Sequence, residues 1–284
     1  MFEGKKIWLA VNAASGSNND AALTELEQAF ADAACLVARR IGFHEEGAPT
    51  IDELRREGVD ILVIFTGDGT VNSIVTALYG WEGAVLVLPG GTMNILAGRL
   101  HGDATPVEII AKVGAGKARR IRPTLVRSRL GDGLSGVLVG PGTAWAEVRE
   151  AMRDTDLLGT IKGAAEAIGE STGGAKVFCR NPDCGRAEGY SAIQVVPTAA
   201  GLAVEGYYAE TIGDYAKQGI ALLRRNFREG PHDDLGCHHA VRLACPEGEE
   251  MGLLIDGEQN AAAAEETFDL ALCEVDLLAT VDGA

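Results

Sequence analysis

The chain has 284 residues and a net charge of −16. Binding to a phosphate backbone needs clustered lysines and arginines, so this charge argues against a nucleic-acid-binding protein. It also opposes attraction to an anionic membrane surface, except through the local basic clusters at residues 119–122 and 224–228. The hydrophobic share of 46% and the charged share of 23% are those of a globular protein of one large or two ordinary domains.

No apolar run reaches the roughly 18 residues of a membrane-spanning helix, and Met1–Lys6 leads directly into a strand pattern instead of a signal peptide. We therefore expect a cytoplasmic protein, in which the six cysteines are reduced thiols. Cys179, Cys184 and residues 237–239 offer side chains that bind zinc. Their spacing matches no common zinc motif, so ordinary thiols are favoured and zinc stays the alternative.

The first 120 residues alternate between strand and helix patterns. Short apolar runs predict strands, and apolar side chains at helical spacing predict helices. The predicted strands are 7–11, 35–38, 61–65 and 84–88, and the predicted helices lie within 23–33, 51–54, 71–78, 93–100 and 106–111. Alternation of this kind with short links indicates an α/β domain built on a parallel sheet.

Beyond about residue 120 the pattern changes to strands, several of which alternate apolar and polar residues as antiparallel strands do. Helical stretches at 144–169 and 214–228 interrupt them. The predicted strands are 125–130, 134–139, 192–196, 202–208, 239–245, 251–255, 267–272 and 277–281. We expect two domains, 1–121 and 122–284, with the last strand able to return to the first.

Three polar, glycine-rich links follow predicted strands of the first domain, at 12–17, 66–70 and 89–94. Ligands of parallel sheets bind beyond the carboxyl ends of the strands. Small residues let backbone N–H groups approach a phosphate, and the N-terminus of the following helix attracts an anion. Each link alone is equally a turn or a helix cap, but the three together predict a polyphosphate-binding site.

Carboxylates stand at two of the strand ends. Asp68, between Gly67 and Gly69, would repel a phosphate, so we expect it to act through Mg²⁺ or as a proton acceptor. Asp256 and Glu258 flank Gly257 much later in the chain. One reading is a hairpin turn, because Asp-Gly is a strong hairpin signal. The other reading is a functional unit, in which one of the two carboxylates binds a metal and the other acts as a base.

In this order, residues 12–16, 66–72, 89–94 and 256–258 resemble the motifs of the diacylglycerol kinase catalytic-domain family, which includes bacterial lipid kinases and sphingosine and ceramide kinases. The resemblance implies a nucleotide-binding domain like that of NAD kinases, followed by a mostly antiparallel β-sandwich that binds the lipid. It implies transfer of phosphate from ATP, with Mg²⁺, to a primary hydroxyl of a diacylglycerol, ceramide or sphingoid base. It also implies peripheral contact with the inner face of the membrane.

The resemblance assigns roles by position. Glu258, Asp256 and Asp68 would be catalytic, with Glu258 favoured as the base, and Asp68 and Asp256 would hold the metal. The predicted nucleotide contacts are Asn12, Ser15, Gly16, Thr66, Gly67, Asp68, Gly69, Thr70, Val71, Asn72, Gly91, Thr92 and Asn94.

Three residues depart from the family pattern: Thr66 replaces a glycine, Ser73 a glutamate and Ala13 a proline. Because of these departures, a catalytically inactive homologue is one alternative to an active lipid kinase. An NAD kinase is a second alternative. Residues 219–228 mix apolar and basic side chains, as either a lipid-binding surface or an ordinary helix would. No Gly-x-Gly-x-x-Gly motif follows the first strand, which argues against a Rossmann oxidoreductase.

Overall fold

The computed structural model describes residues 2–12, 20–91, 93–141, 176–207, 232–246 and 250–282. The chain forms two compact units. The first comprises Met1–Pro123 and Leu272–Ala284, and the second comprises Thr124–Ala271. The predicted helical stretches 144–169 and 214–228, and with them 219–228, lie outside the described residues, as do Ala13, Ser15, Gly16 and Thr92.

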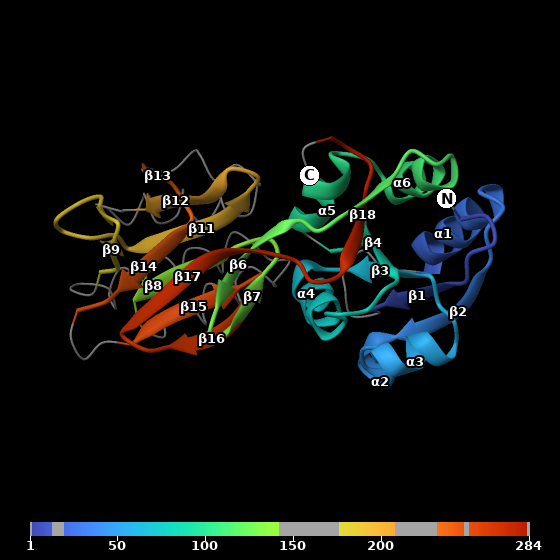
Figure 1. Ribbon diagram of the computed structural model, residues 1–284, viewed down its shortest axis with the longest axis horizontal. Helices are drawn as coiled ribbons and strands as arrows, with labels where there is room; N and C mark the ends of the chain where they lie inside the picture. Colours follow the sequence, from blue (N-terminus) through green and yellow to red (C-terminus); the bar gives the residue numbers. More distant parts are fainter. Residues whose placement is uncertain are drawn as a thin grey trace. The chain divides into compact units, whose positions relative to one another are not determined.

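The first unit is an α/β structure around one six-stranded sheet (Figure 1). The strands lie in the order β2-β1-β3-β4-β18-β5, and all pairs are parallel except β18 with β5. Its elements are β1 (Ile7–Val11), α1 (Asp20–Asp32), β2 (Val37–Gly42), α2 (Phe43–Glu46), α3 (Ile51–Arg56), β3 (Ile61–Thr66), α4 (Asp68–Ala77), β4 (Ala84–Pro89), α5 (Ile95–His101), α6 (Pro106–Gly114), β5 (Arg119–Ile121) and β18 (Asp276–Ala279).

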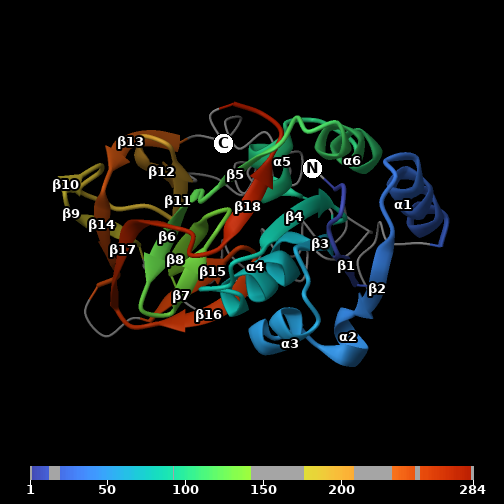
Figure 2. The same cartoon turned by 45° about the vertical axis from the view of Figure 1, so that its right-hand side comes forward.

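Helices cover both faces of this sheet, which explains why β3 and β4 read as continuous apolar runs. Side chains of α1 and α6, such as Phe30 and Ile110, share a core with Val63 and Leu86 on one face. Figure 2 shows α3 and α4 on the opposite side of the sheet. A capping box begins α6, with Thr105 and Glu108 each bonding the other's backbone.

The second strand begins later than the sequence predicts, at Val37 and not at Cys35. The end of α1 takes up the intervening residues: Ala34 has a positive φ of 52°, and the N–H of Cys35 donates to the carbonyl of Phe30. This is the left-handed termination common at helix C-termini. The prediction of a strand at 35–38 is therefore wrong at residues 35–36 and correct at residues 37–38.

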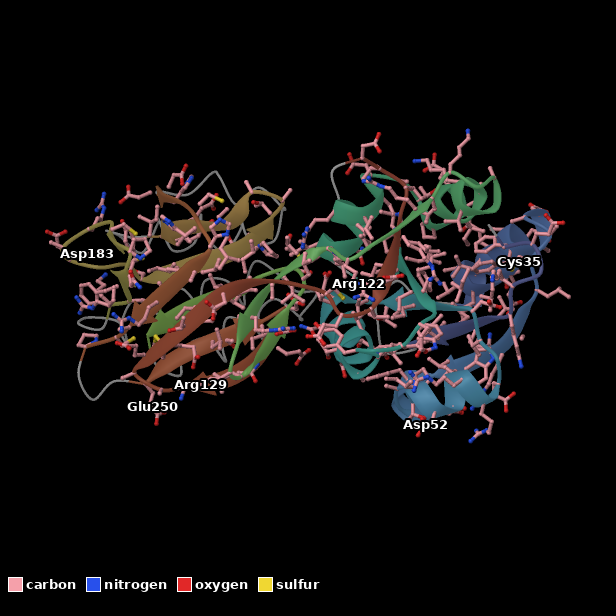
Figure 3. All side chains as sticks on the ribbon, viewed as in Figure 1. Cys35, Asp52, Arg122, Arg129, Asp183 and Glu250 are labelled. Carbon is pink, nitrogen blue, oxygen red and sulfur yellow. The ribbon has the colours of Figure 1, made fainter. Side chains whose placement is uncertain are left out.

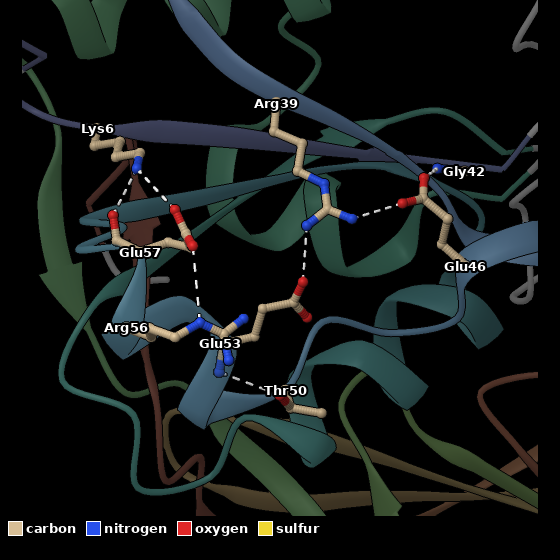
Figure 4. A network of polar contacts seen from close by, with 8 residues as sticks. All are labelled: Lys6, Arg39, Gly42, Glu46, Thr50, Glu53, Arg56 and Glu57. Carbon is tan, nitrogen blue, oxygen red and sulfur yellow. Dashed lines mark hydrogen bonds and ion pairs between the residues drawn. The ribbon is translucent and has the colours of Figure 1, made fainter.

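An exposed polar network joins β2 to the two helices that follow it (Figure 4). Arg39 donates to Glu46 of α2 at 2.6 Å and to Glu53 of α3 at 2.7 Å, and its guanidinium lies 4.8 Å from the ring centroid of Trp8. Exposed ion pairs contribute little each, so this network orients α2 and α3 more than it stabilises the unit.

The second unit is a β-sandwich of two six-stranded sheets, ordered β10-β9-β14-β17-β6-β7 and β13-β12-β11-β8-β15-β16. Both sheets contribute to one buried core, for example Phe268 from one and Val195 from the other. The strands are β6 (Thr124–Ser128), β7 (Gly131–Gly133), β8 (Val137–Pro141), β9 (Phe178–Asn181), β10 (Asp183–Cys184), β11 (Ala192–Thr198), β12 (Gly201–Tyr207), β13 (His232–His238), β14 (Ala240–Ala244), β15 (Met251–Ile255), β16 (Glu258–Ala262) and β17 (Glu265–Leu272).

One predicted strand of this unit is interrupted. Residues 134–139 do not form a single strand, because Leu134, Ser135 and Gly136 make the connection between β7 and β8. The three backbone N–H groups of this connection point to one side chain, that of Asp256. Pairing between strands therefore resumes only at Val137.

Candidate nucleotide-binding and acceptor-activating sites

The three predicted loops follow β1, β3 and β4, which are neighbours in the parallel sheet. The pairing aligns their ends, with Val11 beside Phe65 and Thr66 beside Pro89. Asn12 and the two glycine-containing loops therefore emerge at the same edge. This confirms the geometric premise of the prediction, since all three links begin at the carboxyl ends of adjacent strands.

The two glycine-containing loops touch through their backbones. A Cβ placed on Gly91 would lie 2.5 Å from the Cα of Gly67, and one on Gly90 would lie 2.7 Å from the backbone nitrogen of Thr66. No side chain larger than hydrogen fits at these positions without movement of a backbone. The glycines thus serve the packing of one loop on the other, in addition to any approach of a phosphate.

Asp68 joins the second loop to the helix after the third. Its Oδ2 accepts from the N–H of Ile95 and its Oδ1 from the N–H of Leu96, both at 3.2 Å. Asn94, the residue before α5, makes no side-chain cap of its own and instead exchanges two hydrogen bonds of 2.7 Å with Gly91. Asp68 therefore caps α5 from another element and satisfies two of the backbone N–H groups at the start of that helix.

Asn12 links the first loop to the second. Its Nδ2 donates to Oγ1 of Thr70 at 3.2 Å. The helix α4 begins at Asp68 and contains the next four candidates, residues 69–72. Val71 is buried, and its N–H donates to the carbonyl of Gly67. The described candidates of the first unit are thus one connected group of loops, with Val71 contributing to the core.

Thr66 is the departure from the family pattern that the structure explains. It is the last residue of β3, pairs with Pro89 and is 1% exposed. Its hydroxyl donates to the carbonyl of Gly67 at 3.2 Å. An extended strand residue needs none of the conformational freedom of glycine, so a threonine is accommodated here without backbone strain.

In the second unit, Asp256 and Gly257 form the two-residue turn between β15 and β16, with Ile255 paired to Glu258. Both turn residues have positive φ, 48° and 84°. This is the conformation that the Asp-Gly pair favours in tight hairpins. The hairpin reading of this motif is therefore confirmed, and it places Glu258 at the first position of β16.

The two carboxylates of this motif have different surroundings. Asp256 is buried, and its oxygens accept from the N–H groups of Leu134, Ser135 and Gly136 at 2.8 to 2.9 Å. Glu258 is exposed. The oxygens of Asp256 are thus occupied by three backbone amides, whereas Glu258 is accessible to a substrate.

Among the described residues, no group of three or more His, Cys, Asp or Glu side chains is arranged to hold a metal ion. Asp68 nonetheless suits Mg²⁺ in its chemistry, because this ion takes one or two carboxylates from the protein and most other ligands from phosphates and water. Backbone amides bind both oxygens of each aspartate, but Asp68 is half-buried and accepts from two amides, whereas Asp256 is buried and accepts from three, so Asp256 suits the ion less.

Sequence reasoning did not identify the groups that hold these two aspartates. They are the backbone N–H groups of Ile95 and Leu96 for Asp68, and those of residues 134–136 for Asp256. Backbone amides carry no signature in the sequence. The glycines at 133 and 136 were the available signal, because closely spaced glycines mark a connection whose backbone approaches another group.

Comparison with known proteins agrees with these motifs. Residues 6–126 match the family model of the diacylglycerol kinase catalytic domain, which confirms the resemblance for this part of the chain. No curated protein sequence matches.

Solved structures share the fold along nearly the whole chain. A diacylglycerol kinase from Bacillus anthracis strain Sterne has a TM-score of 0.61 and 16% identity, with 96% of each chain covered. A candidate diacylglycerol kinase from the same strain has a TM-score of 0.61 and 15% identity, with 99% of each chain covered. The predicted fold class, an α/β domain with a parallel sheet and an antiparallel β-sandwich, is thereby confirmed.

Proposed function

We propose that this protein transfers the γ-phosphoryl group of ATP to a primary hydroxyl of a membrane lipid such as a diacylglycerol. The observation that carries the proposal is the connected group of loops in the first unit. Asn12 bonds Thr70, Asp68 caps α5 and Gly91 packs on Gly67. Phosphoryl transfer depends on positioning and charge stabilisation, and loops joined by hydrogen bonds and backbone packing at a sheet edge suit that task.

The phosphates would bind to the backbone N–H groups of residues 67–70 and to the hydroxyl of Thr70. Ser15, Gly16 and Thr92, which the family resemblance also implies as nucleotide contacts, lie outside the described residues. The role proposed for Asp68 is to hold the two glycine loops together through α5. Mg²⁺, when bound near Asp68 and the phosphates, would offset their negative charge. Preorganised loops matter because misplacement of reacting groups by about 1 Å can cost on the order of 100-fold in rate.

Glu258 is the proposed general base, which takes the proton of the lipid hydroxyl. Its exposure supports this role, and a base of this kind typically contributes about 10²- to 10⁴-fold. Asp256 is the proposed positioning residue. Since its carboxylate ties the turn to residues 134–136, it fixes where β16 begins and hence where Glu258 stands.

The proposed acceptor requires contact with a lipid surface. Among the described residues, no helix has both the length and the apolar character needed to cross a membrane. We propose peripheral contact at the cytoplasmic face through a local basic cluster, although the net charge is −16 and the arginines of the described candidate also form ion pairs with Asp276 and Asp282. Residues 119–122 are the described candidate, with Arg122 marked in Figure 3.

The test measures the ADP formed when the protein is incubated with ATP, Mg²⁺ and diacylglycerol in mixed micelles. The wild type should turn over only when lipid is present. Glu258→Gln should lose at least about 100-fold in kcat while its melting temperature stays unchanged. Glu250→Gln, an exposed glutamate outside the site, is the matched control and should behave as wild type. Normal turnover in Glu258→Gln would remove this residue from the mechanism.

A catalytically inactive homologue is the second candidate, and one observation favours it. Ser73 stands on an exposed position of α4 where the family often has a glutamate, so one carboxylate near the phosphate loop is absent. Binding of ATP without ADP release for any acceptor would support that reading. ADP release with NAD in place of lipid would support an NAD kinase.

A further inference from the structure

We propose that Cys179 and Cys184 form a reversible disulfide across the β9–β10 hairpin, by exchange with a low-molecular-weight disulfide such as oxidised glutathione. The inference is independent of the kinase proposal, because it concerns two thiols of the second unit that no step of that mechanism uses.

The two cysteines already lie close to the geometry of a disulfide. The two cysteines are directly paired in the antiparallel register of β9 and β10, and their Sγ atoms are 3.0 Å apart. Directly opposed residues of an antiparallel pair have Cα atoms about 4.5 or 5.5 Å apart, and both values lie within the range that a disulfide requires. The sulfurs need to approach by only about 1 Å to reach bonding distance.

The hairpin is held in place on its own unit, so the sulfurs are not brought together by chance motion of a loop. Cys179 is buried in the core of the sandwich, and β9 pairs with β14 on its other side. Figure 2 shows β9 and β10 side by side, and Figure 3 marks Asp183, the residue before Cys184. On the far side of the hairpin, Arg186 forms an ion pair with Asp233 at 2.9 Å.

The two thiols differ in a way that orders the reaction. Cys184 is half-buried, while Cys179 is buried and donates its S–H to the carbonyl of Pro182 at 3.1 Å. Burial, with the hydrogen bond from Cys184, raises the pKa of Cys179 to about 12. Cys179 is therefore protonated at neutral pH, so the first attack falls to Cys184.

In the first step the Cys184 thiolate attacks one sulfur of the small disulfide. The S–S bond breaks, and one small thiolate leaves and takes up a proton. In the second step the sulfur of Cys179 attacks Cys184, and the second small thiolate leaves with the proton of Cys179. The protein loses two hydrogen atoms, and one small disulfide is reduced to two thiols. A small dithiol such as dithiothreitol reverses both steps.

The sequence offers a direct readout. Trypsin cleaves after Lys176, Arg180 and Arg186, so the two cysteines fall in different peptides, 177–180 and 181–186. The full-length protein is equilibrated in buffers of graded oxidised and reduced glutathione, alkylated, digested and analysed by mass spectrometry. We expect these peptides to be joined after oxidation and separate after dithiothreitol.

Two controls sharpen the test. Cys237 is exposed, so it should carry only glutathione. In Cys184→Ser the joined peptide should disappear while Cys179 stays alkylated. Since the chain has only four residues between the cysteines, the same titration in urea separates fold from sequence proximity. The folded protein should reach its midpoint in a buffer at least about tenfold more reducing, because the fold raises the effective concentration of the two thiols.

Joined peptides with that shifted midpoint would support the proposal. Glutathione on Cys184 without joined peptides, no reaction at either cysteine, or equal midpoints in the folded and unfolded chain would each overturn it. None of these outcomes depends on kinase activity, so the result is separate from the proposed function.

Discussion

A single added methyl group tests the contact between the two glycine loops. In Gly91→Ala the new Cβ would lie 2.5 Å from the Cα of Gly67 and 3.2 Å from its nitrogen, so one loop has to move. Overpacking of this kind costs about 1–3 kcal/mol. For a unit of this size that lowers the melting temperature by about 4–12 °C. The displaced amides should also lower kcat/KM for ATP by about 100-fold.

Gly98→Ala is the matched control. Gly98 lies in the middle of α5, and an added Cβ would meet no atom within 4 Å. Alanine there should stabilise the protein by about 0.5–1 kcal/mol and leave activity unchanged. Thermal unfolding and steady-state kinetics of both variants decide the matter. Wild-type stability and activity in Gly91→Ala would refute the argument that packing of the two loops builds the nucleotide site.

The remaining predictions concern side chains. Asp68→Asn should lower turnover by at least about 100-fold. The control is Asp52→Asn, which alters an exposed aspartate in the first turn of α3 and should have no effect. Equal activities of the two variants would contradict the role of Asp68. Asp256→Asn should lose about 1.5–3 kcal/mol of stability as well as activity, whereas Glu258→Gln should lose activity alone; a stable Asp256→Asn would contradict its positioning role. Burial, with Lys112 adding to it, lowers the pKa of His101 to about 4 from 6.5. The unfolded chain therefore binds its proton first, so up to about 3 kcal/mol of stability present above pH 6.5 should be lost as pH falls to 4, and His101→Gln should flatten that slope in urea unfolding.

Much of the first unit follows from its sequence. The apolar runs at 61–65 and 84–88 predict strands covered on both faces, and β3 and β4 are buried in this way. Thr105 with Pro106 and Glu108 predicts the start of α6, and the capping box is present. In these cases the signal is local, because burial and capping of one segment fix its structure.

Two of the strands missed in the second unit, β13 and β16, lack a local signal. β13 contains mostly polar residues and has one buried side chain, Leu235, while β16 reads Glu-Gln-Asn-Ala-Ala. Each forms because a neighbouring strand, β12 or β15, offers unpaired backbone groups, and such pairing is a property of the tertiary fold.

The candidate site divides in the same way. Glycines and acids at strand ends predicted where its residues lie. That Asp68 faces the amides of α5, and Asp256 those of residues 134–136, follows from elements distant in the sequence. The sequence shows that carboxylates are present at 256 and 258. It does not show that one of them is held by backbone amides and the other is exposed, and the roles proposed for them rest on that difference.

The most direct test of the proposed function follows the phosphate itself. The protein is incubated with γ-labelled ATP, Mg²⁺ and mixed micelles that contain diacylglycerol, monoacylglycerol, ceramide or a sphingoid base, with NAD as a parallel acceptor. Label in one of the lipids, lost in Glu258→Gln, is the result that the account predicts. Label in NAD, or no label in any acceptor although ATP binds, would contradict it.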